Sequence, residues 1–564
     1  MKNLIIILVL VALGVGAYQF LGSGSASKME RLDYVPADTV VLSAQVEPLD
    51  MKTYLASLGL QPGQYGDLST MLEQELEYET DESAKFAMSL FASFIDAVST
   101  PDQMEAKTGI KNQLRSLLFM NGVAPVIHFE LQDEAKFLAF FAEAQQASNI
   151  AFSDELLDGQ SYVRYVLDEN EQIDLLVRAA DGWGVVALHS PKLGEEHLKT
   201  TMAFAKQQNP LVGSEIYKKL TKDYGMGSQG FGFISTEQIG LMFTSLDGNS
   251  LAKDLNLLAG DELAQEFEMF REPACKADIG MLTALWPGLF IDSKVNMKGD
   301  AGVEVQGSML IPTNSQVAID GLKALRGFIP GYVKNNNSIM SIGVGLEVAE
   351  LSGSVNSMFN AMANLPLSCE PLVMAQEELK QNNPTGAFAM AGVANGFFGT
   401  AAAINEFVFD MSGESMAIDA VVSVSAKNIS ALYGSLQTFV PFLGAQPLPA
   451  AGEELSLNQL VPMLDQFGIQ VMAQANQEHL VIYAGEKAKA QAESVLSESV
   501  EANGLQAITI DYGQFFKQLL PIMQMSGQPM PPELESMMET DMVLSVDVNV
   551  NDKGIVMDST VLVK

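Results

Sequence analysis

The chain of 564 residues carries 69 acidic and 32 basic side chains, so its formal net charge at pH 7 is −37. This charge repels phosphate backbones and anionic lipid headgroups, which argues against nucleic-acid binding and against peripheral binding to a membrane surface. Hydrophobic residues make up 48% of the chain, which excludes global disorder, and the length predicts several domains or an internal repeat.

The first predicted element is a hydrophobic helix at the N-terminus. A single lysine, Lys2, precedes an apolar run over residues 4–21, and a Gly/Ser-rich stretch continues to residue 27. As a helix this run is about 27 Å long, roughly the thickness of the hydrocarbon core of a bilayer. Two interpretations are open: a transmembrane helix that anchors the protein in the inner membrane, or a signal peptide that is cleaved near Ala17. Both predict that the rest of the chain lies in the periplasm.

Three later stretches share one pattern: an extended run, a Met-x-Gly turn and a second extended run. They cover residues 114–131, 295–310 and 407–424. Glycine adopts a positive φ without a steric penalty, so each stretch predicts a β-hairpin. A polar residue suited to cap a helix follows each hairpin, and an amphipathic helix follows each cap. The three predicted caps are Asp133, Asn314 and Asn428.

A second correspondence joins the outer parts of the chain. Residues 173–190 match residues 469–486 without a gap, and both segments predict two strands around a polar turn, followed by a helix. We therefore predict an α+β protein of repeated antiparallel sheets with helices on one face, preceded by the N-terminal hydrophobic helix. The predicted domains are a signal or anchor helix with its tether (1–27), a first α+β repeat (28–260), a shortened middle repeat (261–380) and a third α+β repeat (381–564).

The two cysteines, Cys275 and Cys369, bracket the predicted middle repeat. An even number of cysteines in an oxidising compartment favours one disulfide, and closing so long a loop contributes about 4 kcal/mol in the chain-entropy model. Two independent buried thiols are the alternative. The spacing excludes a catalytic Cys-x-x-Cys pair.

Two motifs have the form of a binding site but the wrong context. Residues 225–230 read Gly-x-Gly-x-x-Gly, but they follow a polar helical stretch and enter a strand, whereas a dinucleotide fingerprint follows a strand and opens a helix. Residues 547–552 resemble a calcium loop without the glycine at its sixth position, and their alternating valines predict a strand. We expect neither a nucleotide site nor a calcium site at these positions.

The histidines show no metal-binding or catalytic spacing. His189 and the run Glu195-Glu196-His197 lack the two-histidine helical spacing of a zinc protease, and His128 lies in a predicted strand. We interpret all three histidines as surface or core residues. The sequence thus predicts no catalytic, cofactor-binding or metal-binding residue and no cofactor.

Methionine is unusually frequent, with 30 residues. Met523, Met525 and Met530 lie in a Met-rich stretch that resembles loops that bind copper(I), because thioethers suit a soft cation. Methionine also fills irregular cores, and this structural interpretation is the stronger of the two.

The segment Val35-Pro36-Ala37-Asp38-Thr39, followed at once by a strand, lies where the exported part of the chain begins. It resembles the opening of uncharacterised, membrane-tethered or secreted bacterial proteins that are grouped under a domain of unknown function. The Pro-flanked cysteine pair is similar to a pair in some of those proteins. The resemblance implies a location in the bacterial cell envelope and transfers no activity and no site residues.

Together these features predict a periplasmic, membrane-tethered, non-enzymatic protein that acts as a binding or scaffold component of the cell envelope. An envelope protein or a hydrophobic ligand is the expected partner, and the oligomeric state is left open. The alternative function is a carrier of a hydrophobic ligand such as lipid, held between a sheet and helices rich in Phe and Met.

Overall fold

A computed structural model describes residues 30–51, 54, 72, 74–99, 103–298, 302–335, 337–409, 416–437, 447–460, 462, 467–525 and 541–563. The predicted N-terminal helix, residues 4–21, lies outside the described residues. Among those that are described, no helix is both long enough and apolar enough to cross a membrane. The predictions of a signal peptide or transmembrane helix, and of a periplasmic protein anchored in the inner membrane, therefore have no support in the structure, and we do not retain them.

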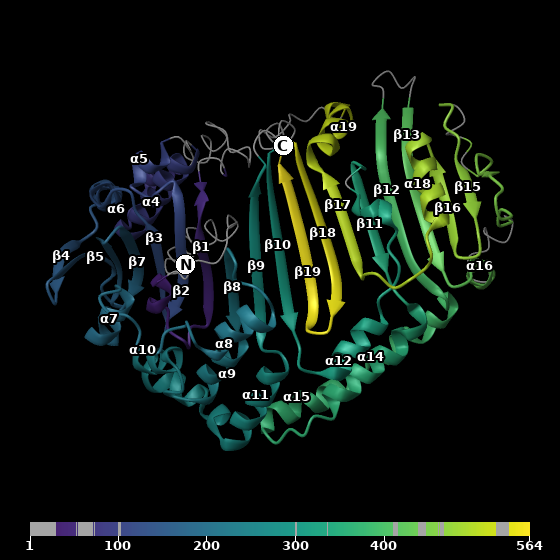
Figure 1. The fold of residues 1–564 in the computed structure, drawn as a ribbon. Helices are drawn as coiled ribbons and strands as arrows, with labels where there is room; N and C mark the ends of the chain where they lie inside the picture. Colours follow the sequence, from purple (N-terminus) through teal and green to yellow (C-terminus); the bar gives the residue numbers. More distant parts are fainter. Residues whose placement is uncertain are drawn as a thin grey trace. The chain divides into compact units, whose positions relative to one another are not determined.

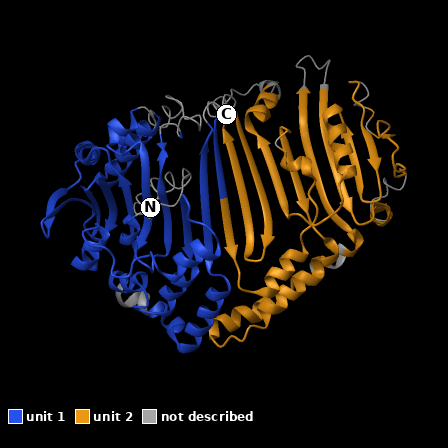
Figure 2. Cartoon of the chain, in the orientation of Figure 1, with its two compact units in different colours: residues 1–307 blue, residues 308–564 orange. Residues whose placement is uncertain are grey.

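The chain divides into two compact units, residues 1–307 (unit 1) and residues 308–564 (unit 2), which Figure 2 shows in different colours. The boundary falls inside the predicted middle repeat, 261–380. Strand β10 (Val303–Pro312) begins in unit 1 and ends in unit 2.

Unit 1 combines strands with short and medium-length helices (Figure 1). Its other strands are β1 (Val41–Asp50), β2 (Gln113–Asn121), β3 (Ala124–Glu130), β4 (Phe152–Leu157), β5 (Gln160–Asp168), β6 (Ile173–Ala180), β7 (Trp183–His189), β8 (Gly230–Ser235) and β9 (Gly288–Met297). Its helices are η1 (Glu30–Tyr34), α4 (Glu82–Ser99), α5 (Met104–Thr108), α6 (Glu134–Ser148), η2 (Pro191–Leu193), α7 (Glu195–Thr201), α8 (Glu215–Lys218), η3 (Lys219–Asp223), α9 (Thr236–Thr244), α10 (Ser250–Glu266), η4 (Glu268–Arg271) and α11 (Pro273–Leu285).

Unit 2 has the same mixture of elements. Its strands are β11 (Met340–Gly345), β12 (Phe397–Phe409), β13 (Met416–Ala426), β14 (Leu455–Ser456), β15 (Met472–Ala475), β16 (His479–Ala484), β17 (Gln506–Asp511), β18 (Met542–Asn551) and β19 (Gly554–Val563). Its helices are α12 (Gln316–Ala324), α13 (Gly331–Lys334), α14 (Val348–Ala363), α15 (Glu370–Gln381), η6 (Pro384–Ala394), α16 (Ile429–Gln437), α18 (Glu486–Ser497) and α19 (Tyr512–Met525).

Within each unit the strands pair in one continuous antiparallel order, and the two orders share their central part. In unit 1 the order is β9-β8-β1-β2-β3-β7-β6-β5-β4. In unit 2 it is β19-β18-β17-β11-β12-β13-β16-β15-β14. The opening strand of each unit (β1 or β11) lies between the next hairpin (β2–β3 or β12–β13) and a strand from much later in the chain (β8 or β17). The same plan therefore occurs twice.

This topology corrects the predicted fold class. The prediction of a separate sheet for each of three repeats is wrong, because the segment predicted as the middle repeat has no sheet of its own. Its strand β9 pairs with β8 in unit 1, whereas its strand β11 lies between β12 and β17 in unit 2. Hairpins look alike in a sequence, and only the long-range backbone pairing shows which sheet a strand joins.

The prediction that helices cover only one face of the sheet is also wrong for unit 1, where both faces are covered. Successive side chains of a strand point to opposite faces. On one face, strand residues such as Val177 and Val186 pack in one core cluster with Phe137 and Phe141 of α6. On the other face, Arg31 of η1 donates a hydrogen bond from Nε to Nδ1 of the fully buried His128 (3.2 Å).

In unit 2, helices cover one face of the sheet more fully than the other. Val421 and Val481 pack with Ala488 and Ala492 of α18 in a buried cluster. The opposite face carries apolar side chains that remain partly exposed, among them Ile404, which is 40% exposed.

The predicted helix caps are found at two of the three positions. The side chain of Asp133 accepts a hydrogen bond from Lys136 N at the start of α6, and that of Asn428 accepts one from Ala431 N at the start of α16. At α12 the prediction of Asn314 is wrong by one residue, because Ser315 is the residue whose side chain accepts the capping hydrogen bond.

Candidate functional site

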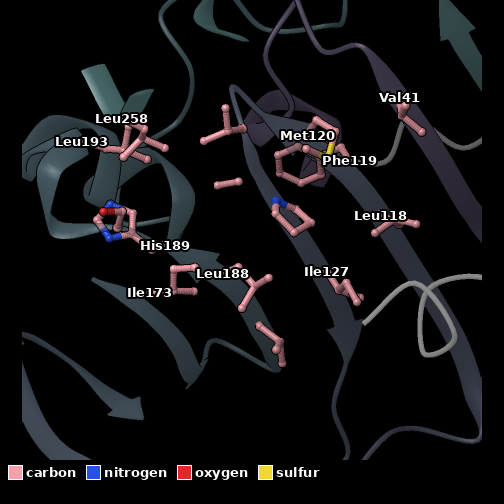
Figure 3. Close-up of a pocket in the computed structure, with 15 residues that line it drawn as sticks. Val41, Leu118, Phe119, Met120, Ile127, Ile173, Leu188, His189, Leu193 and Leu258 are labelled. Atoms are coloured by element: carbon pink, nitrogen blue, oxygen red, sulfur yellow. The ribbon is translucent and has the colours of Figure 1, made fainter. Parts of the chain in front are cut away.

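An apolar pocket of about 540 Å³ lies in unit 1. Its walls come from strands β1, β2, β3, β6 and β7, and from η2 and α10 (Figure 3). Most of the side chains that line it are apolar, among them Leu118, Met120, Ile127, Leu188, Leu193 and Leu258. The volume lies in the range of sites that bind small molecules.

The hairpin β2–β3 supplies the central wall. Leu118 lies opposite Ile127 and Met120 lies opposite Pro125 in the strand register, so these four side chains share one face of the sheet. The predicted turn Met120-Asn121-Gly122 is present, with Gly122 at φ 59°. The alternation of this hairpin thus presents a contiguous apolar surface to the pocket.

Asp254 joins helix α10 to this hairpin. Its side chain is 5% exposed, and its Oδ2 accepts a hydrogen bond from Val123 N (3.1 Å) just after the turn. The same oxygen lies 3.1 Å from Nε2 of His197. A Cβ atom at Gly122 would lie 1.6 Å from this oxygen, so glycine is required there for both the turn and the contact. This contact holds α10, and with it Leu258, against the end of the strands.

His189 and Ser190 form the polar part of the lining. Figure 3 shows His189 at the end of the pocket where Leu193 and Leu258 also lie. His189 and Ser190 are 7% and 6% exposed, and in the described structure His189 Nε2 and Ser190 Oγ have no hydrogen-bond partner. Burial, with smaller contributions from His197 and Arg164, lowers the pKa of His189 to about 3. The imidazole is therefore neutral at pH 7.

Ser190, His189, His197 and Asp254 are the residue types of a catalytic triad, but their hydrogen bonds differ from those of a triad. His197 Nε2 lies 3.1 Å from both Asp254 Oδ2 and Asn121 O, and its Nδ1 lies 3.2 Å from Thr201 Oγ1. Both ring nitrogens of His197 are thus engaged with groups other than Ser190. The bond between nucleophile and base that activates a serine is not formed.

The histidines singled out in the sequence come together, but not as a metal site. The ring centroids of His189 and His197 lie 5.4 Å apart. Within the described part of the chain, no group of three or more His, Cys, Asp or Glu residues is arranged to hold a metal ion. Glu195 and Glu196 pair with Lys199 at 2.7 and 3.4 Å.

The motifs in the form of nucleotide and calcium sites are parts of turns and strands. Residues 225–230 lead from η3 into strand β8 and open no helix. Residues 547–552 cover the end of β18 and its turn, where Asn551 Oδ1 accepts hydrogen bonds from Lys553 N (2.8 Å) and Gly554 N (3.2 Å). The side chain of Asn551 thus satisfies the backbone of the hairpin turn.

Cys275, Cys369, Met523 and Met525 do not line the pocket. Cys275 in α11 and Cys369 at the start of α15 are each 1% exposed, and neither is a free thiol. Their pairing with each other stays a prediction. Met523 and Met525 lie in the last turn of α19, and Met530 lies outside the described residues.

A second cavity, of about 500 Å³, lies in unit 2 and is lined mainly by polar groups. Those groups already pair with one another. Glu454 Oε1 lies 2.9 Å from Lys489 Nζ and accepts a hydrogen bond from Tyr483 Oη at 2.9 Å. Two buried polar atoms without a partner in the described structure, His189 Nε2 and Ser190 Oγ, belong to residues that line the pocket of unit 1, whereas no such atom belongs to a residue that lines this second cavity. The pocket of unit 1 is therefore the better candidate.

Sequence reasoning missed the unit 1 pocket, although it predicted the strands that line it. The signal was the alternation of apolar residues in the hairpin at residues 114–131, which does not show whether its apolar face meets a helix or a cavity. Comparisons with family models, with curated proteins and with solved structures found no match to this chain.

Proposed function

We propose that the chain is a non-catalytic binding protein for a small hydrophobic ligand, held in the pocket of unit 1. The observation that supports this is an apolar cavity of about 540 Å³ with two buried polar side chains at one end. Cavities of this size, with mostly apolar walls and a few polar groups, are the usual form of a small-molecule site. The proposal keeps the carrier function that the sequence left as the alternative.

The physical driving force is the burial of apolar surface. Leu118, Met120 and Ile127 present their side chains to the cavity from the sheet, and Leu258 presents its side chain from α10. An apolar ligand that covers these groups gains about 25 cal/mol for each Å² of apolar surface removed from water. A ligand of modest length therefore binds without any charged contact.

The test is a titration of the full chain with N-phenyl-1-naphthylamine, an uncharged dye that fluoresces in apolar sites. We expect saturable binding, and we expect Leu118→Trp, which places an indole in the cavity, to weaken it at least tenfold. Leu156→Trp is the matched control, because Leu156 on β4 is 71% exposed. Equal affinity of Leu118→Trp and the unchanged chain, with both folded by circular dichroism, would refute binding in this pocket.

A further inference from the structure

The polar end of the pocket indicates which headgroup the ligand carries, an inference that rests on the proposed function. His189 Nε2 and Ser190 Oγ are buried polar atoms without a hydrogen-bond partner among the described residues. Leaving such a group unpaired costs about 1–3 kcal/mol, and buried polar groups in native proteins are nearly always paired. A ligand whose polar group reaches these two atoms would remove this cost.

The charges around this end disfavour an ionised headgroup. The neighbouring cation, Arg164, is already paired, with Nε 2.7 Å from Asp174 Oδ2. The carboxylate of Asp254 faces His197, and Lys192 in η2 is exposed. A carboxylate ligand would therefore lose its hydration without meeting a cation among the residues that line the pocket, and burial of an unpaired charge is costly.

The available hydrogen-bonding chemistry fits an uncharged group that both donates and accepts. A neutral imidazole nitrogen donates or accepts according to its tautomer, and a serine hydroxyl does both. A ligand hydroxyl can pair with the two atoms in either tautomer of His189. A carbonyl oxygen can pair with them only when both atoms donate.

From this arrangement we infer that the pocket selects a long-chain ligand with an uncharged hydroxyl headgroup, a fatty alcohol rather than a fatty-acid anion. The apolar chain covers the wall of β2 and β3, and the hydroxyl reaches His189 and Ser190. Selection against the anion follows from the desolvation of the carboxylate, and selection for the hydroxyl follows from the two unpaired atoms.

The experiment displaces N-phenyl-1-naphthylamine from the full chain at pH 7.5 with 1-decanol or with decanoate. We expect 1-decanol to bind at least tenfold more tightly than decanoate. Ser190→Ala should weaken 1-decanol by about fivefold to tenfold, the effect of one hydrogen bond, and leave the affinity for the dye within twofold. Ser161→Ala, at an exposed position on β5, is the matched control and should change neither affinity.

Two outcomes separate this inference from the function on which it rests. If the dye binds and decanoate displaces it as well as 1-decanol does, or Ser190→Ala leaves 1-decanol unchanged, the headgroup inference is overturned and the pocket still binds apolar ligands. If neither the dye nor either ligand binds, the proposed function itself fails. His189→Phe tests the hydrogen bond from the other side chain and should also weaken the binding of 1-decanol. If His189→Phe does not fold, Ser190→Ala, which removes only one oxygen atom, still tests the inference.

Discussion

Replacing Asp254 with alanine should separate helix α10 from the hairpin β2–β3. The buried carboxylate accepts a hydrogen bond from Val123 N and contacts His197 Nε2, both at 3.1 Å. Alanine removes both contacts and leaves the Val123 N–H without its acceptor. Because α10 carries Leu258, the same change should also loosen one wall of the pocket.

The size of the effect follows from these two contacts. A hydrogen bond to a charged acceptor contributes about 1.5–3 kcal/mol to stability, and a further neutral donor contributes about 0.5–1.5 kcal/mol. We therefore expect Asp254→Ala to lower the free energy of unfolding of unit 1 by about 3 kcal/mol. With a urea dependence of about 3 kcal/mol per M, the unfolding midpoint should fall by about 1 M.

Tryptophan fluorescence measures unit 1 selectively within the full chain. The chain has 2 tryptophans, Trp183 and Trp286, and both lie in unit 1. Asp254→Asn keeps an acceptor for Val123 N and should lose less than half as much stability. Asp96→Ala is the control, because it removes an exposed carboxylate from a surface ion pair and should cost less than about 1 kcal/mol. A midpoint for Asp254→Ala within 0.2 M of the unchanged chain would refute the proposed link between α10 and the hairpin.

Further predictions use the same urea assay or a mass measurement. Burial lowers the pKa of His189 to about 3, so below pH 6.5 the unfolded chain binds a proton that the folded chain does not. The free energy of unfolding of unit 1 therefore falls as the pH falls from 6.5 to 5. His189→Phe should reduce this dependence on pH by up to about 1.4 kcal/mol per pH unit, and an unchanged dependence would contradict the burial of the ring. Gly122→Ala brings a Cβ within 1.6 Å of an Asp254 oxygen and should destabilise unit 1 by more than 2 kcal/mol. The control is Gly182→Ala, which has φ 72° and open space around it and should destabilise unit 1 by only about 1 kcal/mol; equal losses of stability would contradict the close approach at Gly122. If the two cysteines form a disulfide, alkylation of the denatured chain should add two alkyl groups only after reduction, and alkylation without reductant would exclude the bond.

Local sequence patterns identified several hairpins correctly and misgrouped one of them. The segments 173–190 and 469–486 were matched by sequence, and in the structure they form the equivalent pairs β6–β7 and β15–β16. The hairpin at residues 295–310 was grouped with the one at 407–424, yet β9 pairs with β8 and thereby occupies the place of β18, not of β12. Turn glycines and alternation are common to all hairpins, and they carry no information about the distant partner strand.

The pocket was out of reach of sequence reasoning for a related reason. Its lining runs from Val41 to Leu258, and these residues meet only after the strands have paired in register. A shift of one residue in that register would turn every pocket side chain of a strand to the opposite face. His189, at the polar end of the pocket, is interpreted from the sequence as a surface or core residue, because a single histidine has no sequence pattern that distinguishes a ligand contact from a core position.

The sequence by itself determined the local features of this protein: the glycine turn at Gly122, the capping of α6 by Asp133 and α16 by Asn428, and the matching segments of the duplication. These depend on φ preferences and on hydrogen bonds within a few residues. The tertiary structure alone decided that the plan occurs twice, that both faces of the sheet in unit 1 are covered, and that His189 and Ser190 are buried beside an apolar cavity. Those features depend on contacts between residues far apart in the chain, such as Arg31 with His128 and Val123 with Asp254, and no local pattern specifies such contacts.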